Sequence, residues 1–312
     1  MGSTTSMKPT LQVTREARGR VRGDGIELAF GYWPGRGTPV IALHGLTASY
    51  VNFIGIAECL QGRVPLLGFD LRGRGDADKP EGPYGMSQHA RDVAAAMRNM
   101  GLGASVVMGH SMGAFIAAAL AAQEPGLVSG LILIDGGFPL ATPAGVPLDL
   151  SLNAALAQRI TQLRQTYASR KDYREFWRSQ PNFPREDWNR WVEAFLDYEV
   201  GGESPVQPKA AEAAVRADLG EAFQQGAIVE RLKAIRVPAM FLRAEKGFTP
   251  DQAPLYPDEV LPQIKALIPQ IEDIKFAGTT HYTIAIGEKA AARIADLVCE
   301  MVNRIQSQIK RE

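Results

Sequence analysis

The sequence predicts an α/β protein with a mostly parallel, twisted sheet that is flanked by helices and interrupted by one helical insertion. Three observations indicate this fold class. Short apolar runs that suit buried strands alternate with segments of helical periodicity in the first part of the chain. The alternation stops between residues 139 and 224, where the chain becomes polar, aromatic and helical, and it resumes afterwards. Strands that alternate with helices form βαβ units, and such units build a parallel sheet.

The first part of the chain alternates strands and helices in a regular order. Residues 21–32 are predicted to form a strand or hairpin, because apolar and polar side chains alternate there around a turn at residues 23–25. Short apolar runs predict buried strands over residues 39–43, 64–69, 104–109 and 127–134. Helical periodicity predicts helices over residues 51–60, 87–100 and 111–123, with Ser87 as the N-cap of the second.

The last part of the chain returns to this pattern. We expect a strand over residues 238–243, a helix near residues 258–268, a strand over residues 271–276 and a final helix from about Glu288. The predicted domain organisation is therefore a core of residues 1–138 and 225–312 that carries a helical lid of residues 139–224. Proline-rich stretches at residues 139–147 and 205–208 suit the hinges of such a lid.

Composition narrows the class of partner. The chain has 34 basic and 34 acidic residues, so no net field attracts nucleic acid or an acidic membrane. No apolar run is long enough to span a membrane, and the first twenty residues lack the apolar centre of a secretory signal. We therefore expect a cytoplasmic protein that binds a small-molecule substrate. The two cysteines, Cys59 and Cys299, are too few for a disulfide framework and are predicted to be buried free thiols. The oligomeric state is left open.

One short motif points to nucleophilic chemistry. Gly109-His110-Ser111-Met112-Gly113 has the form G-x-S-x-G and lies between a predicted strand and an alanine-rich predicted helix. A sharp turn at such a junction exposes the serine hydroxyl, and the glycines permit strand and helix to approach closely. The start of the helix adds unpaired N–H groups and the positive end of the helix dipole. Ser111 is therefore the candidate nucleophile.

Four motifs in this order resemble the α/β-hydrolase fold superfamily from about Gly25 to the C-terminal helix. They are His44-Gly45, Asp70-Leu-Arg-Gly-Arg-Gly, the segment 109–113, and a histidine after the last strand, His281. The resemblance implies a serine hydrolase in which Ser111 attacks the substrate and His281 is the general base. An imidazole suits that role because its pKa lies near neutrality. No metal or organic cofactor is implied.

Three residues are candidates for the acid of the triad. The superfamily most often places it in the turn after the strand that follows the lid, and the chain offers Glu245 at the end of that strand and Asp251 beyond it. Some members, including certain lactone and amide hydrolases, instead resemble this chain in having an acid after the strand that follows the nucleophile helix. Asp135 holds that position, and it can reach the histidine because the tips of both strands lie near the histidine loop. It is favoured over Glu245 and Asp251 because Lys246 and Gly247 stand near the usual acid position.

The resemblance also assigns supporting roles near the nucleophile. His44-Gly45-Leu46 resembles the oxyanion loop, so the backbone N–H groups of Leu46 and Met112 are expected to hold the developing oxyanion. His44 is expected to fix that loop through hydrogen bonds.

Three other predictions concern residues outside the chemistry itself. His110 is expected to pack within the turn around Ser111, and His89 to lie at the surface or partly buried on a helix. Asp70 and Arg72 are expected to pair with each other and brace the oxyanion loop.

The predicted lid is rich in aromatic side chains, including Tyr167, Tyr173, Phe176, Trp177, Phe183, Trp188, Trp191, Phe195 and Tyr198. Most of them are needed for the lid's own core, but some are expected to line an apolar pocket over Ser111. Our candidates for that pocket are Trp177, Trp188, Trp191 and, outside the lid, Tyr282. The lid also contains several arginines, of which one could bind a substrate carboxylate, namely Arg159, Arg164, Arg170, Arg174, Arg178, Arg185 or Arg190.

These observations predict cleavage of an ester or lactone of a small to medium, aromatic or apolar substrate through an acyl-enzyme. A serine nucleophile argues against the epoxide hydrolases and dehalogenases of this fold, which use a carboxylate. Two alternatives keep the same triad: hydrolysis of an amide or a C–C bond, and a receptor that binds a small ligand without turning it over. A haloperoxidase-like or cofactor-free oxygenase activity is a further alternative, because fold does not determine function.

Overall fold

The computed structural model describes residues 16–140, 148–221 and 224–309. Its main sheet has eight strands in the order β1-β2-β4-β3-β5-β6-β9-β10. Their bounds are Ala17–Arg22, Glu27–Trp33, Leu66–Phe69, Val40–Leu43, Ser105–His110, Val128–Ile134, Ala239–Ala244 and Ile271–Phe276, in that same order. Neighbouring strands are parallel from β4 to β10, whereas β2 is antiparallel to both β1 and β4. The predicted fold class is therefore confirmed.

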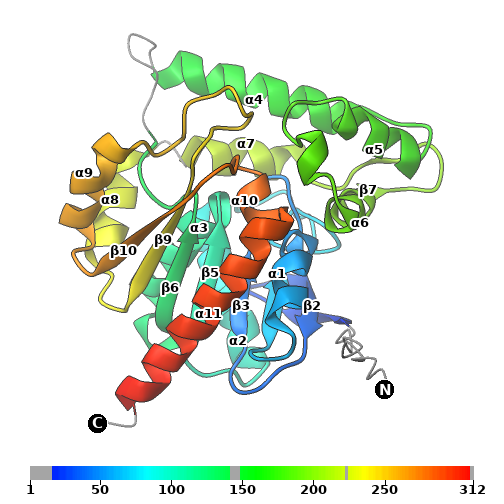
Figure 1. Cartoon of the computed structure of the whole chain (residues 1–312). Coiled ribbons are helices and arrows are strands. Elements are labelled where there is room, and N and C mark those ends of the chain that lie inside the picture. The colour runs from blue at the N-terminus through cyan, green and yellow to red at the C-terminus, as the bar shows by residue number, and fades with distance from the viewer. Residues whose placement is uncertain (1–15, 141–147, 222–223, 310–312) are drawn as a thin grey trace, which may run out of the picture.

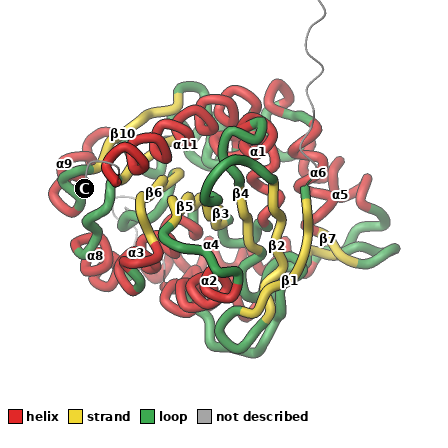
Figure 2. Tube along the Cα trace, turned by 90° about the horizontal axis from the view of Figure 1, so that it is seen from below, coloured by secondary structure: helices red, strands yellow, loops and turns green. Residues whose placement is uncertain are grey.

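Helices cover both faces of this sheet, as Figure 2 shows. On one face α2 packs against α3, and on the other α1 packs against α11. Their bounds are Met86–Asn99, Met112–Gln123, Ile54–Leu60 and Glu288–Ile309, and α8 (Gln225–Lys233), α9 (Leu261–Leu267) and α10 (Thr283–Ile286) complete the core. The predicted cap of α2 was wrong, because the helix begins at Met86 and its N-cap is Gly85 with φ 108°.

The central strands supply side chains to two hydrophobic cores. In β3, Ile41 and Leu43 join the core under α2 and α3, whereas Val40 and Ala42 join the core under α1 and α11. Alternate residues of a strand point to opposite faces of a sheet, so a strand covered on both sides must be apolar throughout. This requirement explains why the uninterrupted apolar runs of the sequence predicted these strands correctly.

Between β6 and β9 the described chain adds no strand to the main sheet. It forms α4 (Leu148–Arg164), α5 (Arg170–Arg178), α6 (Arg190–Glu199) and α7 (Glu212–Glu221), with a two-stranded ribbon of β7 (Val200–Gly201) and β8 (Gln207–Pro208). Figure 1 shows these helices as a layer beyond one end of the sheet. Residues 141–147 and 222–223, next to the two expected boundaries, lie outside the described residues, so the limits of the lid stay a prediction.

Three sequence-based expectations concern membrane-spanning helices, the two cysteines and the N-terminal segment. Across residues 16–140, 148–221 and 224–309, no helix combines the length and the apolar character that crossing a membrane requires. Cys59 and Cys299 are free thiols, but each is partly exposed, so the prediction that they are buried was wrong. The segment predicted to lack a secretory signal lies mostly in residues 1–15, outside the described residues.

Candidate active site

Ser111 occupies a strained turn between β5 and α3. Its φ of 54° and ψ of −120° lie in a region that residues with a side chain rarely adopt. The two glycines of the motif make this turn possible. A Cβ on Gly109 would lie 2.1 Å from the Gly113 carbonyl oxygen, and a Cβ on Gly113 would lie 1.9 Å from the Leu43 carbonyl oxygen. The turn therefore requires glycine at both positions, and it presents the Ser111 hydroxyl at the end of the sheet.

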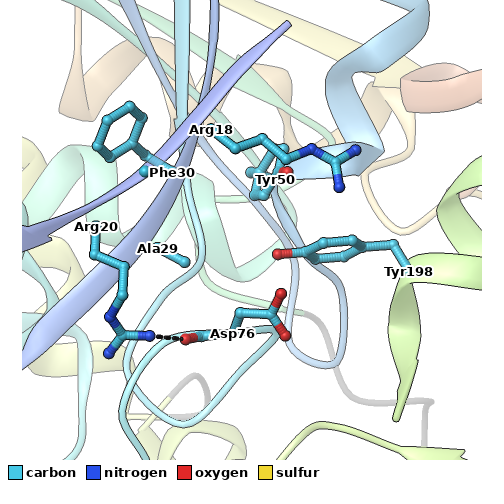
Figure 3. Close-up of a pocket in the computed structure, with 8 residues that line it drawn as sticks. Arg18, Arg20, Ala29, Phe30, Tyr50, Asp76 and Tyr198 are labelled. Carbon is cyan, nitrogen blue, oxygen red and sulfur yellow. Dashed lines mark hydrogen bonds between the residues drawn. The ribbon is translucent and has the colours of Figure 1, made fainter.

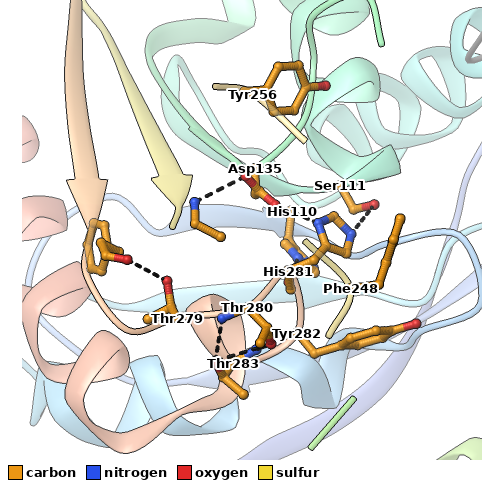
Figure 4. Close-up of polar contacts among 12 residues, drawn as sticks. His110, Ser111, Asp135, Phe248, Tyr256, Thr279, Thr280, His281, Tyr282 and Thr283 are labelled. Atoms are coloured by element: carbon orange, nitrogen blue, oxygen red, sulfur yellow. Dashed lines mark hydrogen bonds and ion pairs between the residues drawn. The ribbon is translucent and has the colours of Figure 1, made fainter. Parts of the chain in front are cut away.

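His281 lies between Ser111 and Asp135 and contacts both. Its Nε2 is 3.0 Å from Ser111 Oγ, and its Nδ1 is 2.7 Å from Asp135 Oδ2 (Figure 4). Asp135 follows β6, is 1% exposed and also accepts a hydrogen bond from the Ala244 N–H through Oδ1. A buried carboxylate on Nδ1 keeps the proton on that nitrogen, which leaves Nε2 free to accept the serine proton. The structure thus brings together the three residues that we predicted as a triad.

The two alternative acids have other partners. Glu245 accepts a hydrogen bond from the Gly278 N–H over 2.7 Å, and Asp251 is exposed and bonded to the Thr249 hydroxyl. The sheet order explains why two positions were open, because β6 and β9 are neighbours and end at the same edge. Of the candidates, Asp135 is the one that reaches the histidine ring.

The predicted oxyanion residues lie on two segments beside Ser111. Met112 is the first residue of α3, and an α-helix leaves its first N–H groups without an acceptor inside the helix. Leu46 follows Gly45, at which a Cβ would lie 3.3 Å from Ser111 Cβ. The loop after β3 therefore passes directly next to the candidate nucleophile, as an oxyanion loop must.

The other histidines have structural surroundings. His44 is fully buried, accepts a hydrogen bond from the Leu71 N–H at Nε2 and contacts the Gly45 carbonyl at Nδ1, which confirms that it fixes the loop. Burial lowers its pKa to about 3, so the ring is neutral. His89 is fully buried in α2, so the prediction of a surface or partly buried residue was wrong.

His110 does more than pack within the turn. Its Nε2 lies 2.8 Å from the His281 carbonyl oxygen, and the two rings are 4.9 Å apart. Burial lowers the pKa of His110 to about 3, so the neutral ring donates this hydrogen bond. No pattern in the sequence indicates this contact, because the two histidines are 171 positions apart. His110 thus joins the serine turn to the backbone of the histidine loop.

The expected pair of Asp70 and Arg72 does not form. Arg72 donates to both oxygens of Asp92, over 2.7 and 2.6 Å, and Asp70 instead accepts from the backbone N–H groups of Tyr50 and Asp76 and from the Tyr198 hydroxyl. Both side chains are buried, but each forms its hydrogen bonds with other residues. The prediction that Asp70 and Arg72 pair and together brace the oxyanion loop was therefore wrong.

An aromatic group surrounds the candidate base. Around the ring of His281, Phe248 lies at 4.8 Å and Tyr282 at 5.8 Å between ring centroids (Figure 4). Tyr282 also contacts Phe183 and Trp177. Phe248 is 37% exposed although it is apolar, which suits a wall that substrate covers. Phe248 was not among the predicted pocket residues, because its loop was expected to contribute only a candidate acid, Glu245 or Asp251.

Two predicted pocket residues have contacts elsewhere. Trp191 packs on α1, where a Cβ on Gly55 would lie 2.6 Å from its ring, and its Nε1 donates to Glu58. Trp188 lies beyond Phe183, with its Nε1 bonded to Glu193 and the Arg178 guanidinium over its face. Tyr282 and Trp177 are therefore the better candidates for the pocket.

Two ionisable residues of the insertion, Arg159 and Glu199, lie near this aromatic group. Arg159 in α4 donates to the Tyr282 hydroxyl over 2.9 Å and lies 5.9 Å from the centre of the Phe248 ring. Glu199 in α6 accepts a hydrogen bond from the Tyr173 hydroxyl over 3.1 Å. Burial raises the pKa of Glu199 to about 8, although the bond from Tyr173 and the charge of Arg159 lower it.

Glu199→Gln is expected to change the pH dependence of stability. The pKa of Glu199 is raised on folding, so its contribution to stability is full below about 4.5 and is lost as pH rises through about 8. Glutamine keeps an acceptor for Tyr173 and never ionises. The melting temperature of the variant should match that of the wild type at pH 5 and exceed it by a few degrees at pH 9. A difference that does not vary with pH would contradict the assignment.

A separate hollow of about 280 Å³ lies beside β1 and β2 (Figure 3). It is lined by Arg18, Gly19, Arg20, Ala29, Phe30, Tyr50, Asp76 and Tyr198. Its arginines already have acidic partners, since Arg18 pairs with Glu16 and Arg20 with Glu27 and Asp78. None of its lining residues belongs to the triad, so we place the chemistry at Ser111.

Within the described part of the chain, no group of three or more His, Cys, Asp or Glu side chains is arranged to hold a metal ion.

Comparison with known proteins gives one family and several relatives. A family model described as the alpha/beta hydrolase fold matches residues 38–287. The chain is 26% identical over 254 residues to 2-(acetamidomethylene)succinate hydrolase of Mesorhizobium japonicum, which covers 80% of this chain and 83% of that protein. It is 29% identical over 238 residues to N-formylmaleamate deformylase of Pseudomonas putida, with 74% and 79% covered.

Among solved structures, the fold is similar to that of E-2-(acetamidomethylene)succinate hydrolase. The TM-score is 0.77 at 22% identity, and the match covers 93% of this chain and 100% of that one.

Proposed function

The chain belongs to the α/β-hydrolase fold family and is a hydrolase, and on this premise we propose that it cleaves a small acyl substrate through a covalent acyl-enzyme on Ser111. The observation that carries the proposal is the position of His281, with one ring nitrogen 3.0 Å from Ser111 Oγ and the other 2.7 Å from Asp135. A serine hydroxyl is a weak nucleophile unless a base of this kind removes its proton.

The mechanism follows from these contacts. Ser111 Oγ attacks the substrate carbonyl carbon while His281 Nε2 takes the hydroxyl proton, and Asp135 stabilises the imidazolium that forms. The N–H groups of Leu46 and Met112 donate to the oxygen that gains negative charge. His281 then returns the proton to the leaving group as the C–N or C–O bond breaks. Water, activated by the same histidine, attacks the acyl-enzyme and releases Ser111 and the acid.

We propose an amide as the bond that is cleaved, with an ester or lactone as the second candidate. The order differs from the sequence-based expectation because the two relatives above are named for an acetamido and an N-formyl group, both of which are amides. Their names also contain carboxylates, as succinate and maleamate. We therefore propose an N-acyl compound that carries a carboxylate as the substrate class. Nothing in the triad geometry prevents ester turnover, because the same steps release an alcohol.

The test of this proposal is intact-mass spectrometry after exposure to a fluorophosphonate, together with a panel of amide, ester, lactone and dienone substrates. One adduct that is absent from Ser111→Ala, with turnover of amides that bear a carboxylate, supports the proposal. Turnover confined to esters or to dienones would replace the amide by one of the alternatives. No adduct and no turnover, with tight binding of a small ligand, would favour the receptor alternative.

Arg159→Gln should weaken selectivity for a substrate carboxylate. The Arg159 guanidinium lies beside Tyr282 and Phe248, both of which contact His281, so a carboxylate bound over the triad is within reach of it. A hydrogen bond to a charged group contributes about 1.5–3 kcal/mol, so kcat/KM for carboxylate substrates should fall tenfold to a hundredfold. Turnover of neutral p-nitrophenyl acetate should change little.

The matched control is Arg178→Gln on the outer side of the insertion. Arg178 is 41% exposed and pairs with Glu175 and Glu193, so its loss should leave both substrates unaffected. An equal loss for neutral and charged substrates in Arg159→Gln would rule out the carboxylate role.

A further inference from the structure

The turn after β4 contains an arginine to which the mechanism above assigns no role. Arg74 is completely buried, between β4 and α2. Burial of a guanidinium is unfavourable unless its N–H groups find partners, and a charged partner must balance it. The partners of Arg74 therefore indicate what it does.

Two of these partners are the residues expected to form the oxyanion hole. Arg74 Nε donates to the Leu46 carbonyl oxygen over 2.9 Å, and Nη2 lies 3.8 Å from the Met112 sulfur. The Leu46 carbonyl belongs to the peptide that follows Leu46, so this bond restricts rotation about ψ of Leu46 and anchors the loop that carries the Leu46 N–H. The contact with Met112 packs the second residue against the same guanidinium. One side chain thus touches both segments that must converge on the oxyanion.

The charge of Arg74 is balanced by a carboxylate from the insertion. Asp218 of α7 is completely buried, and its Oδ2 lies 2.5 Å from Arg74 Nη1. The same carboxylate accepts a hydrogen bond from the Gly85 N–H over 2.7 Å and contacts His89 Nε2 at 2.9 Å. Burial raises the pKa of Asp218, but Arg74 and His89 lower it by more, to about 2, so the carboxylate is ionised at neutral pH.

Two further hydrogen bonds hold α7 against the segment between β4 and α2. The Ala211 N–H, just before α7, donates to the Gly73 carbonyl over 2.8 Å, and the Met86 N–H donates to Glu221 Oε2 over 2.7 Å. The position of Asp218, and through it that of Arg74, therefore depends on the docking of α7.

We propose that Arg74 is a positioning residue for the oxyanion hole and that Asp218 of the insertion holds it in place. The inference rests on the proposed function, because it supplies the geometry for the same acyl transfer. It also replaces the pair of Asp70 and Arg72 as the brace of the oxyanion loop. The insertion thus contributes to the chemistry through α7 and not only by covering the site.

The test compares Arg74→Lys with Arg72→Lys. Lysine keeps the charge near Asp218 but presents one compact ammonium, which cannot contact Asp218, Leu46 and Met112 together. Arg72 is the matched control, because it is a buried arginine of the same turn whose side chain bonds Asp92 and the Asp24 carbonyl. For each chain we would measure kcat and KM for p-nitrophenyl acetate, inhibition by phenylboronic acid and the melting temperature. Phenylboronic acid forms a tetrahedral adduct with serine whose oxygen occupies the oxyanion hole.

In Arg74→Lys we expect kcat to fall on the order of tenfold to a hundredfold with little change in KM, since misplacement of a catalytic contact costs that much. Affinity for phenylboronic acid should fall by a similar factor. In Arg72→Lys we expect a lower melting temperature with kcat retained. Asp218→Asn, which keeps an acceptor for the Gly85 N–H, should reproduce the loss in kcat and serves as the second variant if Arg74→Lys does not fold.

The possible results separate this inference from the proposed function. If the wild type is active and Arg74→Lys and Arg72→Lys have the same kcat, the role of Arg74 is overturned and the proposed function stands. If the kcat of Asp218→Asn equals that of the wild type, the proposed contribution of α7 to the oxyanion hole is overturned. A wild type that neither reacts with fluorophosphonate nor turns over any substrate would overturn the proposed function, and this inference with it.

Discussion

Ser111→Ala should abolish turnover, with a fall in kcat on the order of 10⁶. The variant loses the hydroxyl oxygen that lies 3.0 Å from His281 Nε2, so no acyl-enzyme can form. Alanine occupies the same strained backbone position as serine, and the flanking glycines are unchanged, so the fold should be retained. The measurement is kcat for an amide and for p-nitrophenyl acetate, with intact mass after fluorophosphonate exposure.

The control for this variant is Ser105→Ala. Ser105 is a buried serine at the start of the same strand β5, and its hydroxyl donates to the Gly103 carbonyl. Its loss should cost some stability and leave labelling intact. Activity of Ser111→Ala within tenfold of the wild type would disprove the role of Ser111 as the nucleophile.

Asp135→Asn should lower kcat on the order of 10⁴, as for other triad aspartates. The expected cause is a change of tautomer. Asp135 accepts two hydrogen bonds, from the Ala244 N–H through Oδ1 and from His281 Nδ1 through Oδ2. Asparagine has one acceptor oxygen, so if that oxygen stays on Ala244, its NH₂ group faces His281. The ring must then accept at Nδ1 and keep its proton on Nε2, where it can no longer take the proton of Ser111.

Glu245→Gln is the matched control for this variant, because it makes the same chemical change at the acid expected from most of the superfamily. Glu245 accepts from the Gly278 N–H, and glutamine can still do so, so kcat should stay near that of the wild type. If kcat fell in Glu245→Gln or in Asp251→Asn while Asp135→Asn stayed active, the acid would belong to the loop after β9.

Several features of this protein follow from local sequence. Each buried strand was predicted correctly because a strand covered on both faces needs an uninterrupted apolar run, as in Val40–Leu43. The turn at Ser111 was predictable because its glycines are required by contacts between adjacent elements, within a few positions along the chain. The position of His281 could be predicted because a loop between the last strand and the final helix ends at the same edge of the sheet as β5.

Partners of buried polar groups could not be predicted in this way. The sequence alone offered Asp135, Glu245 and Asp251 as the acid, and it is the placement of β6 beside β9 and of the histidine loop above them that brings Asp135 to the ring of His281. Arg72 lies two positions after Asp70 in the motif, yet its guanidinium forms hydrogen bonds with Asp92 of α2. Arg72 and Asp92 are 20 positions apart, and no pattern in either segment indicates that their side chains are in contact.

The role of the insertion was decided by tertiary structure as well. Amphipathic helices over residues 148–221 could be expected from periodicity, but which of their side chains reach the core could not. Trp191 packs on α1, Arg159 bonds Tyr282, and Asp218 pairs with Arg74 across 144 positions of sequence. Sequence determines which segments form strands, helices and sharp turns, because those depend on neighbours along the chain. Pairing between distant charges depends on how the completed elements pack, and only the three-dimensional arrangement decides it.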